Sequence, residues 1–203
     1  MKTYEYAGDP FDEPRSHPWL GAVDSPNARY YDLTANPARI RSSLEDFLPW
    51  SRFPAVETFY ALLERLNHPK SALESNDCAF TGPHPNEDRT IVKALQCCGR
   101  VMVLFRELER NTEEGLMDRL KNELHVELGE LDSEFQWGVV GTTLIPVRYL
   151  ALSEVEGKQL GSQLMISFWA WGDQPADTML NLARVMKNLT QALRRVSARA
   201  ARS

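Results

Sequence analysis

The chain has 203 residues, of which 43% are hydrophobic and 25% are charged, and both fractions are ordinary for a globular protein. This composition excludes a chain that is disordered throughout, because such chains lack the apolar residues needed for a core. The 23 basic and 28 acidic residues leave a net charge of −5, which argues against general affinity for nucleic acid. No apolar run in the sequence approaches the roughly 18 residues that cross a bilayer.

The start of the sequence and the cysteines both point to the cytoplasm. The first residues, MKTYEYAGDPFDEP, carry acids and prolines where a secretory signal has a basic segment and an apolar run. The three cysteines, Cys78, Cys97 and Cys98, cannot all pair with one another, and this usage fits a reducing compartment. We therefore expect a cytoplasmic protein with a single domain spanning residues 1–203.

Prolines divide the N-terminal part of the chain. Ten of the twelve prolines fall within residues 1–85, where each fixes φ and removes a backbone donor. Residues 1–40 are nevertheless rich in aromatic side chains, so we expect an extended segment that lies on the body and adds at most a short strand. Residues 41–90 predict a helix and a long loop, since apolar residues at helical spacing end at Leu66 and residues 67–90 are rich in turn formers.

Residues 91–203 predict the body of the fold, in the order β-α-β-β-α. The predicted elements are a buried strand over 99–108, a helix over 113–128, strands over 135–152 and 160–171, and a last helix from Pro175. Asn111 or Thr112 is placed to cap the first of these helices. This order favours an α+β fold in which a mixed or antiparallel sheet carries its helices on one face.

Two tryptophans occur in the segment FWAWGD, residues 168–173. Trp169 and Trp171 are two positions apart, so they share one face of the predicted strand. Large aromatic residues on a sheet are usually core, and the apolar stripe of the last helix is the obvious cover. The alternative is a stacking platform for a nucleobase or a sugar.

The sequence lacks the common catalytic motifs, including the P-loop, the dinucleotide-binding glycine pattern and the nucleophile elbow. Its one reactive-looking neighbourhood is residues 74–90, with Asp77, Cys78 and His84. A thiol and an imidazole six positions apart can act as nucleophile and base if the loop brings them into contact. The alternative is a buried thiol and an exposed imidazole, and we predict no catalytic residue.

A metal site would have to combine Cys78, His84, Cys97 and Cys98, a donor set that suits tetrahedral zinc. Adjacent cysteines point to opposite faces of a strand, however, so one ion can hardly bind both. The spacing of the four residues matches no established zinc pattern. We therefore predict neither a metal nor any other cofactor.

Charge is distributed unevenly along the C-terminal half. Residues 106–134 contain ten acids and four bases, a local charge of −6, whereas residues 184–203 contain six bases and no acid. The basic end is favourable at a helix C-terminus, and it lacks the interleaved aromatic residues of a nucleic-acid-binding segment. The acidic stretch is either a solvated helix face or a surface that attracts a basic partner. Under the second interpretation the binding residues are Glu107, Glu109, Glu113, Glu114, Asp118, Glu123 and Glu127.

The chain resembles the immunity proteins that bacteria pair with polymorphic toxins, including those of contact-dependent inhibition and type VI secretion, in its size, its net negative charge and its acidic segment 107–134. The resemblance implies a non-enzymatic protein that neutralises a cognate toxin by tight one-to-one binding. The toxin would be a basic domain and in particular a nuclease, since a nuclease presents Lys and Arg to phosphates. Two alternatives stay open: a small hydrolase that uses Cys78 and His84, and a nucleic-acid-associated protein that uses the basic last helix.

Overall fold

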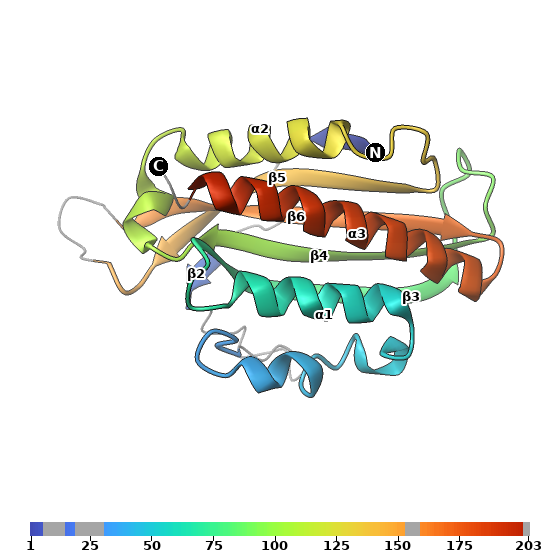
Figure 1. Ribbon diagram of the computed structural model, residues 1–203, viewed down its shortest axis with the longest axis horizontal. Coiled ribbons are helices and arrows are strands. Elements are labelled where there is room, and N and C mark those ends of the chain that lie inside the picture. Colours follow the sequence, from blue (N-terminus) through green and yellow to red (C-terminus); the bar gives the residue numbers. More distant parts are fainter. Residues whose placement is uncertain (6–14, 19–30, 153–158, 201–203) are drawn as a thin grey trace.

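The computed structural model describes residues 1–5, 15–18, 31–152 and 159–200, and Figure 1 shows how its elements are arranged. The helices are α1 (Pro54–Leu66), α2 (Leu116–Gly129) and α3 (Pro175–Ala200). The strands are β1 (Lys2–Glu5), β2 (Arg15–His17), β3 (Leu73–Pro85), β4 (Leu95–Phe105), β5 (Gly138–Tyr149) and β6 (Leu160–Gly172). Short 3-10 helices are η1 (Pro37–Arg41), η2 (Leu48–Trp50) and η3 (Leu108–Thr112).

These strands form one sheet, in the order β1-β5-β6-β4-β3, and β2 pairs with β5 farther along the edge that β1 occupies. The pairs β3–β4, β4–β6 and β6–β5 are antiparallel, while β1 and β2 run parallel to β5. The structure confirms the predicted α+β class and the β-α-β-β-α order of residues 91–203. The prediction that residues 67–90 form a loop is wrong, because β3 lies there; two register shifts against β4 accommodate its turn-forming residues.

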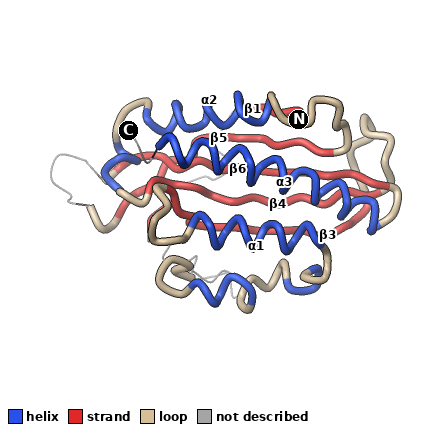
Figure 2. The backbone as a smooth tube through the Cα atoms, viewed as in Figure 1, coloured by secondary structure: helices blue, strands red, loops and turns tan. Residues whose placement is uncertain are grey.

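The three helices cover one face of the sheet. Figures 1 and 2 show α3 lying along the strands between α1 and α2. The stripe predicted on the last helix is buried there, and its members are Met179, Leu182, Val185, Met186, Leu189, Leu193 and Val196. Ile166 and Phe168 of β6, together with Val101 and Val103 of β4, belong to the same core. The main hydrophobic core therefore lies between the sheet and the helical layer.

The other face of the sheet carries buried polar side chains. Strand β2 pairs with β5 at one edge, yet its side chains reach β3 at the opposite edge: Nδ1 of His17 lies 2.8 Å from Oδ1 of Asn76, and Arg15 donates to Asp77 at 2.9 Å. The sheet must therefore curl until its two edges approach each other on this face. Asn76 also donates to Gln163 of β6 at 2.8 Å, so polar groups buried here satisfy one another.

The tryptophans of β6 lie on this second face. Phe168 belongs to the core under the helices, and side chains alternate along a strand, so Trp169 and Trp171 project away from α3. The ring of Trp169 meets that of Tyr4 of β1, with 5.5 Å between the ring centroids. The prediction that the tryptophans share one face is confirmed, and the prediction that the last helix covers them is wrong.

Replacing a member of the α3 stripe should destabilise the fold. Leu189 is fully buried, so Leu189→Ala should lower the free energy of unfolding by about 2–5 kcal/mol, through lost burial and the cavity left behind. Leu180 lies on the same helix but is 67% exposed, and Leu180→Ala should change stability by less than about 0.5 kcal/mol. Urea unfolding followed by circular dichroism measures both. Equal losses in the two variants would contradict this placement of the helix.

Candidate functional site

The predicted acidic residues lie on η3, on α2 and on the residues that flank η3, and a buried asparagine holds η3 against the end of β4. Oδ1 of Asn111 accepts a hydrogen bond from the backbone N–H of Phe105, and its Nδ2 donates to the carbonyl oxygen of Phe105, both at 2.8 Å. Asn111 thus pairs with β4 as a neighbouring strand would. A Cβ on Gly161 of β6 would come within 2.3 Å of the Asn111 carbonyl oxygen, so only glycine allows this close approach.

Helix α2 begins in a left-handed turn. Its N-cap is Gly115, whose φ of 74° favours glycine. The prediction that Asn111 or Thr112 caps the helix is wrong, because η3 contains both residues and ends before the helix starts. The predicted leucine stripe is buried at Leu120 and Leu124, and this burial directs the opposite side of α2 to the solvent.

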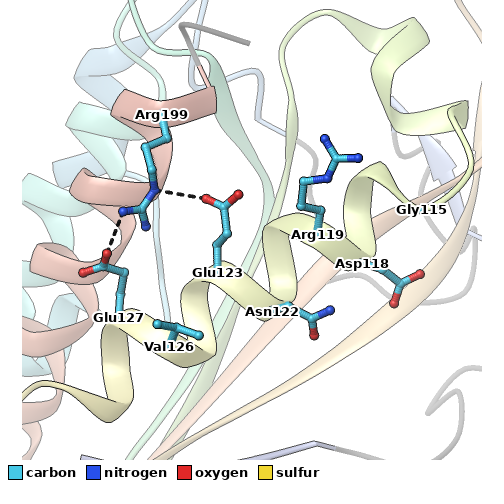
Figure 3. A pocket seen from close by; sticks show the side chains of 8 residues that line it. All are labelled: Gly115, Asp118, Arg119, Asn122, Glu123, Val126, Glu127 and Arg199. Carbon is cyan, nitrogen blue, oxygen red and sulfur yellow. Dashed lines mark hydrogen bonds and ion pairs between the residues drawn. The ribbon is translucent and has the colours of Figure 1, made fainter.

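The C-terminal half of α2 forms ion pairs with the basic end of α3. Arg195 and Arg199 lie 2.7 and 2.8 Å from carboxylate oxygens of Glu127, and Arg199 lies 3.1 Å from Glu123; Figure 3 shows both pairs of Arg199. Glu127 is only 6% exposed, and the hydrogen bonds from both arginines hold the pKa of its carboxyl below the usual value. We call these four residues the ion-pair cluster. They pair two of the ten acids in residues 106–134 with two of the six bases in residues 184–203.

The acids that precede α2 have no such compensation. Arg106 donates to the carbonyl oxygens of Ser71 and His68 at 3.0 and 3.1 Å, and Arg110 donates to that of Ala200 at 3.0 Å. Both arginines of this stretch therefore bind backbone carbonyls of the fold. Four exposed carboxylates, which we call the acidic patch, form no ion pair within the described part of the chain: Glu107, Glu109, Glu113 and Glu114.

A hollow of about 550 Å³ lies beside this patch, on the exposed side of α2 (Figure 3). Its lining consists of Gly115, Asp118, Arg119, Asn122, Glu123, Val126, Glu127 and Arg199. It brings together three of the predicted binding residues, of which Asp118 is compensated by Lys121 at 3.2 Å. Val126, which is 62% exposed, places an apolar surface among these charged groups.

Sequence reasoning missed Val126 and Arg119. The signal for Val126 was its position two residues after Leu124, where the leucine stripe predicts solvent and the sequence nevertheless has an apolar residue. Arg119 had no signal of its own, because a lone base among many acids looks like ordinary surface charge.

The alternative catalytic residues lie on different faces of β3. Cys78 packs against the core under the helices, and burial raises the pKa of its thiol well above the usual value. His84 lies opposite Gln96 of β4 on the other face, with its Nε2 3.1 Å from the amide nitrogen. Asp77 is also on that face, in the polar cluster around β2. The structure therefore does not bring the thiol and the imidazole together.

The cysteine pair is divided in the same way. Cys97 is fully buried under the helices, and Cys98 lies across from Trp169 on the opposite face. This confirms the prediction that adjacent cysteines project to opposite sides of the strand. In residues 1–5, 15–18, 31–152 and 159–200, no three or more His, Cys, Asp or Glu side chains are grouped so that they could hold a metal ion.

None of the helices in the described ranges is long and apolar enough to cross a membrane. Comparison with known proteins finds no matching family model, no matching curated protein and no matching solved structure. Function must therefore be inferred from the chemistry of this surface.

Cys78 should react slowly in the folded protein. The thiolate is the form that iodoacetamide alkylates, and burial disfavours that form. At about pH 8, peptide mapping by mass spectrometry should find Cys78 unmodified in the native protein and modified after unfolding in urea. Rapid native labelling would instead mark it as a reactive group.

The ion-pair cluster should make stability depend on acid pH. Because the folded-state pKa of Glu127 lies below its ordinary value of 4.5, its contribution is complete above that value and is lost as the pH falls through the lowered pKa. Glu127→Gln should cost about 1 kcal/mol at neutral pH, since both arginines are half exposed and solvent screens the pairs. The stability of the Glu127→Gln variant should also fall less than that of the wild type on acidification, because the variant lacks this carboxyl. Glu134→Gln, at an exposed acid without an ion pair in the described ranges, should follow the wild-type curve in urea melts, and identical curves for both variants would contradict the pairing.

Proposed function

We propose that the chain is a non-enzymatic binding protein that neutralises a basic protein partner, as a toxin-immunity protein does, and that the acidic patch is its first contact with that partner. The observation that carries this proposal is the contrast between the two groups of acids. Glu123 and Glu127 are paired within the fold, whereas the four carboxylates of the patch are exposed and unpaired in the described chain. Of these two groups of acids, the patch is the one that presents uncompensated negative charge to a partner.

The acidic patch also has a rigid base. Asn111 fixes η3 to β4 through two hydrogen bonds, and the left-handed Gly115 sets the start of α2. Carboxylates on a fixed frame lose little conformational freedom on binding, so more of the interaction energy remains as affinity. A clustered charge of one sign also accelerates encounter with an oppositely charged protein.

A basic nuclease is the class of partner that this surface fits best. A nuclease needs a positive cleft to bind nucleic-acid phosphates, and an inhibitor can use that field without imitating a base. The competing interpretation, nucleic-acid binding by the end of α3, has less support because Arg195 and Arg199 are engaged by Glu127. The structure likewise gives no support to the hydrolase alternative, since Cys78 and His84 lie on different faces of β3.

The test is association with the protein encoded by the adjacent gene. Reversing two patch charges with Glu113→Lys and Glu114→Lys should leave folding intact, because exposed charges contribute little to stability. The association rate measured by surface plasmon resonance at low salt should fall about tenfold, and its salt dependence should weaken.

The matched control changes net charge by the same amount away from the patch, with Glu87→Lys and Glu134→Lys at exposed acids. It should reduce the rate far less. Equal loss in the two double variants would show that net charge acts without a defined patch. An unchanged rate in the patch variant would overturn the proposal.

A further inference from the structure

A second, smaller hollow continues the one beside α2. It has a volume of about 110 Å³ and shares Arg119, Glu123 and Arg199 with the outer hollow. The two hollows adjoin at these three side chains. Together the hollows make one groove that runs from the exposed side of α2 toward the end of α3. We call the two parts the outer and the inner hollow.

The inner hollow has an apolar floor. Phe105 and Leu120 line it from β4 and α2, and Val196 lines it from α3. A cavity of about 150 Å³ accepts a benzene molecule, so the space of about 110 Å³ suits one aliphatic side chain. An aliphatic group placed there would leave water and contact side chains that already belong to the core.

One cation that lines this groove is not engaged within the described part of the chain. Arg199 is bound by Glu123 and Glu127, and Arg110 lies 4.4 Å above the centre of the Phe105 ring while it donates to a backbone carbonyl. Arg119 lines both hollows, yet within the described ranges its guanidinium forms no hydrogen bond or ion pair. Figure 3 shows its side chain standing apart from the pair made by Glu123.

We propose that this groove binds the C-terminal residue of the protein partner, with an aliphatic side chain in the inner hollow and the terminal carboxylate on Arg119. This inference rests on the proposed function, because it assigns the site to the same partner. The guanidinium fork matches a carboxylate with two parallel hydrogen bonds. The residue before the terminus would lie in the outer hollow, where the exposed Val126 offers an apolar contact.

The geometry favours a chain terminus over an internal segment. Successive side chains of an extended chain point to opposite sides, so an aliphatic residue and a neighbouring acid would not both enter one hollow. In a C-terminal residue the side chain and the carboxylate leave the same Cα. Both can therefore reach the inner hollow and Arg119, which lines it, at the same time.

The site can be tested without the partner. The probe is an acetylated tripeptide ending in leucine with a free carboxylate, titrated into the isotope-labelled full chain and followed by the backbone amide signals of α2. We expect saturable shifts around Arg119 with a Kd of about 1 mM. The same peptide with a C-terminal amide, and the free acid with Arg119→Gln, should each bind about tenfold more weakly. Arg65→Gln is the control, because this exposed arginine lies on α1, which α3 separates from α2.

Equal binding of the acid and the amide, unchanged binding to Arg119→Gln, or no saturable shifts would each overturn the site and leave the acidic-patch proposal intact. The double variant at Glu113 and Glu114 should bind the peptide acid at least as tightly as the wild type, because the charge reversal beside the site favours a carboxylate. Loss of partner association in that variant therefore reports on the patch alone. With the partner itself, removing its last residue should speed dissociation and leave the association rate unchanged, and an unchanged dissociation rate would also contradict the assignment.

Discussion

The burial of α3 against the sheet determines where charged groups can lie on the helical side of the molecule. Its apolar stripe extends to Val196 near the end of the helix, and a stripe of this length fixes the rotation of the helix about its own axis. The rotation that buries Val196 sets the directions of Arg195 and Arg199, which meet Glu127 of α2. One hydrophobic constraint thereby also sets the electrostatics of the neighbouring helix.

This constraint divides the acids of the sequence into two groups with different roles. Those in the later turns of α2 lie beside α3 and form ion pairs that link the two helices. Little of their charge is therefore available to a partner. Those at Glu113 and Glu114 precede the helix and lie on the η3 side of Gly115. Their carboxylates stay uncompensated within the described chain because the nearby Arg106 and Arg110 bind backbone carbonyls instead.

Hydrophobic spacing predicted most of the fold, because the buried face of a helix or strand is visible in the spacing of apolar residues along a short segment. The last helix and strands β4, β5 and β6 follow from it. Strand β3 could not be predicted, since Asn76 and Gly82 look like turn residues and only pairing with β4, with its two register shifts, makes the segment extended. Strand alternation likewise placed Trp169 and Trp171 on one face without indicating which face the helices cover.

In the candidate site, too, local sequence features could be predicted and contacts between distant residues could not. The acidic stretch was visible in the sequence, but the partners of Glu123 and Glu127 lie about 70 residues away along the chain, and a local charge count cannot include them. The position of Arg119 in the groove could not be predicted, because the other residues that line the groove come together only in the fold. Asn111 resembled a helix cap because its side chain suits that role, and its bonds to β4 are a tertiary contact.

A surface that attracts a basic protein and a groove that binds a carboxylate are compatible because the two interactions act over different distances. Exposed charges are felt across about 10 Å at moderate salt, so in the proposed complex the acidic patch would act on the partner before contact and set the rate of encounter. A carboxylate on Arg119 acts only once the inner hollow is filled and water is displaced, where electrostatic interactions strengthen. Under the two proposals, the patch would govern association and the groove would govern dissociation. Opposite signs at neighbouring sites also favour specificity, since a partner that is basic throughout would satisfy the patch and leave Arg119 facing like charge.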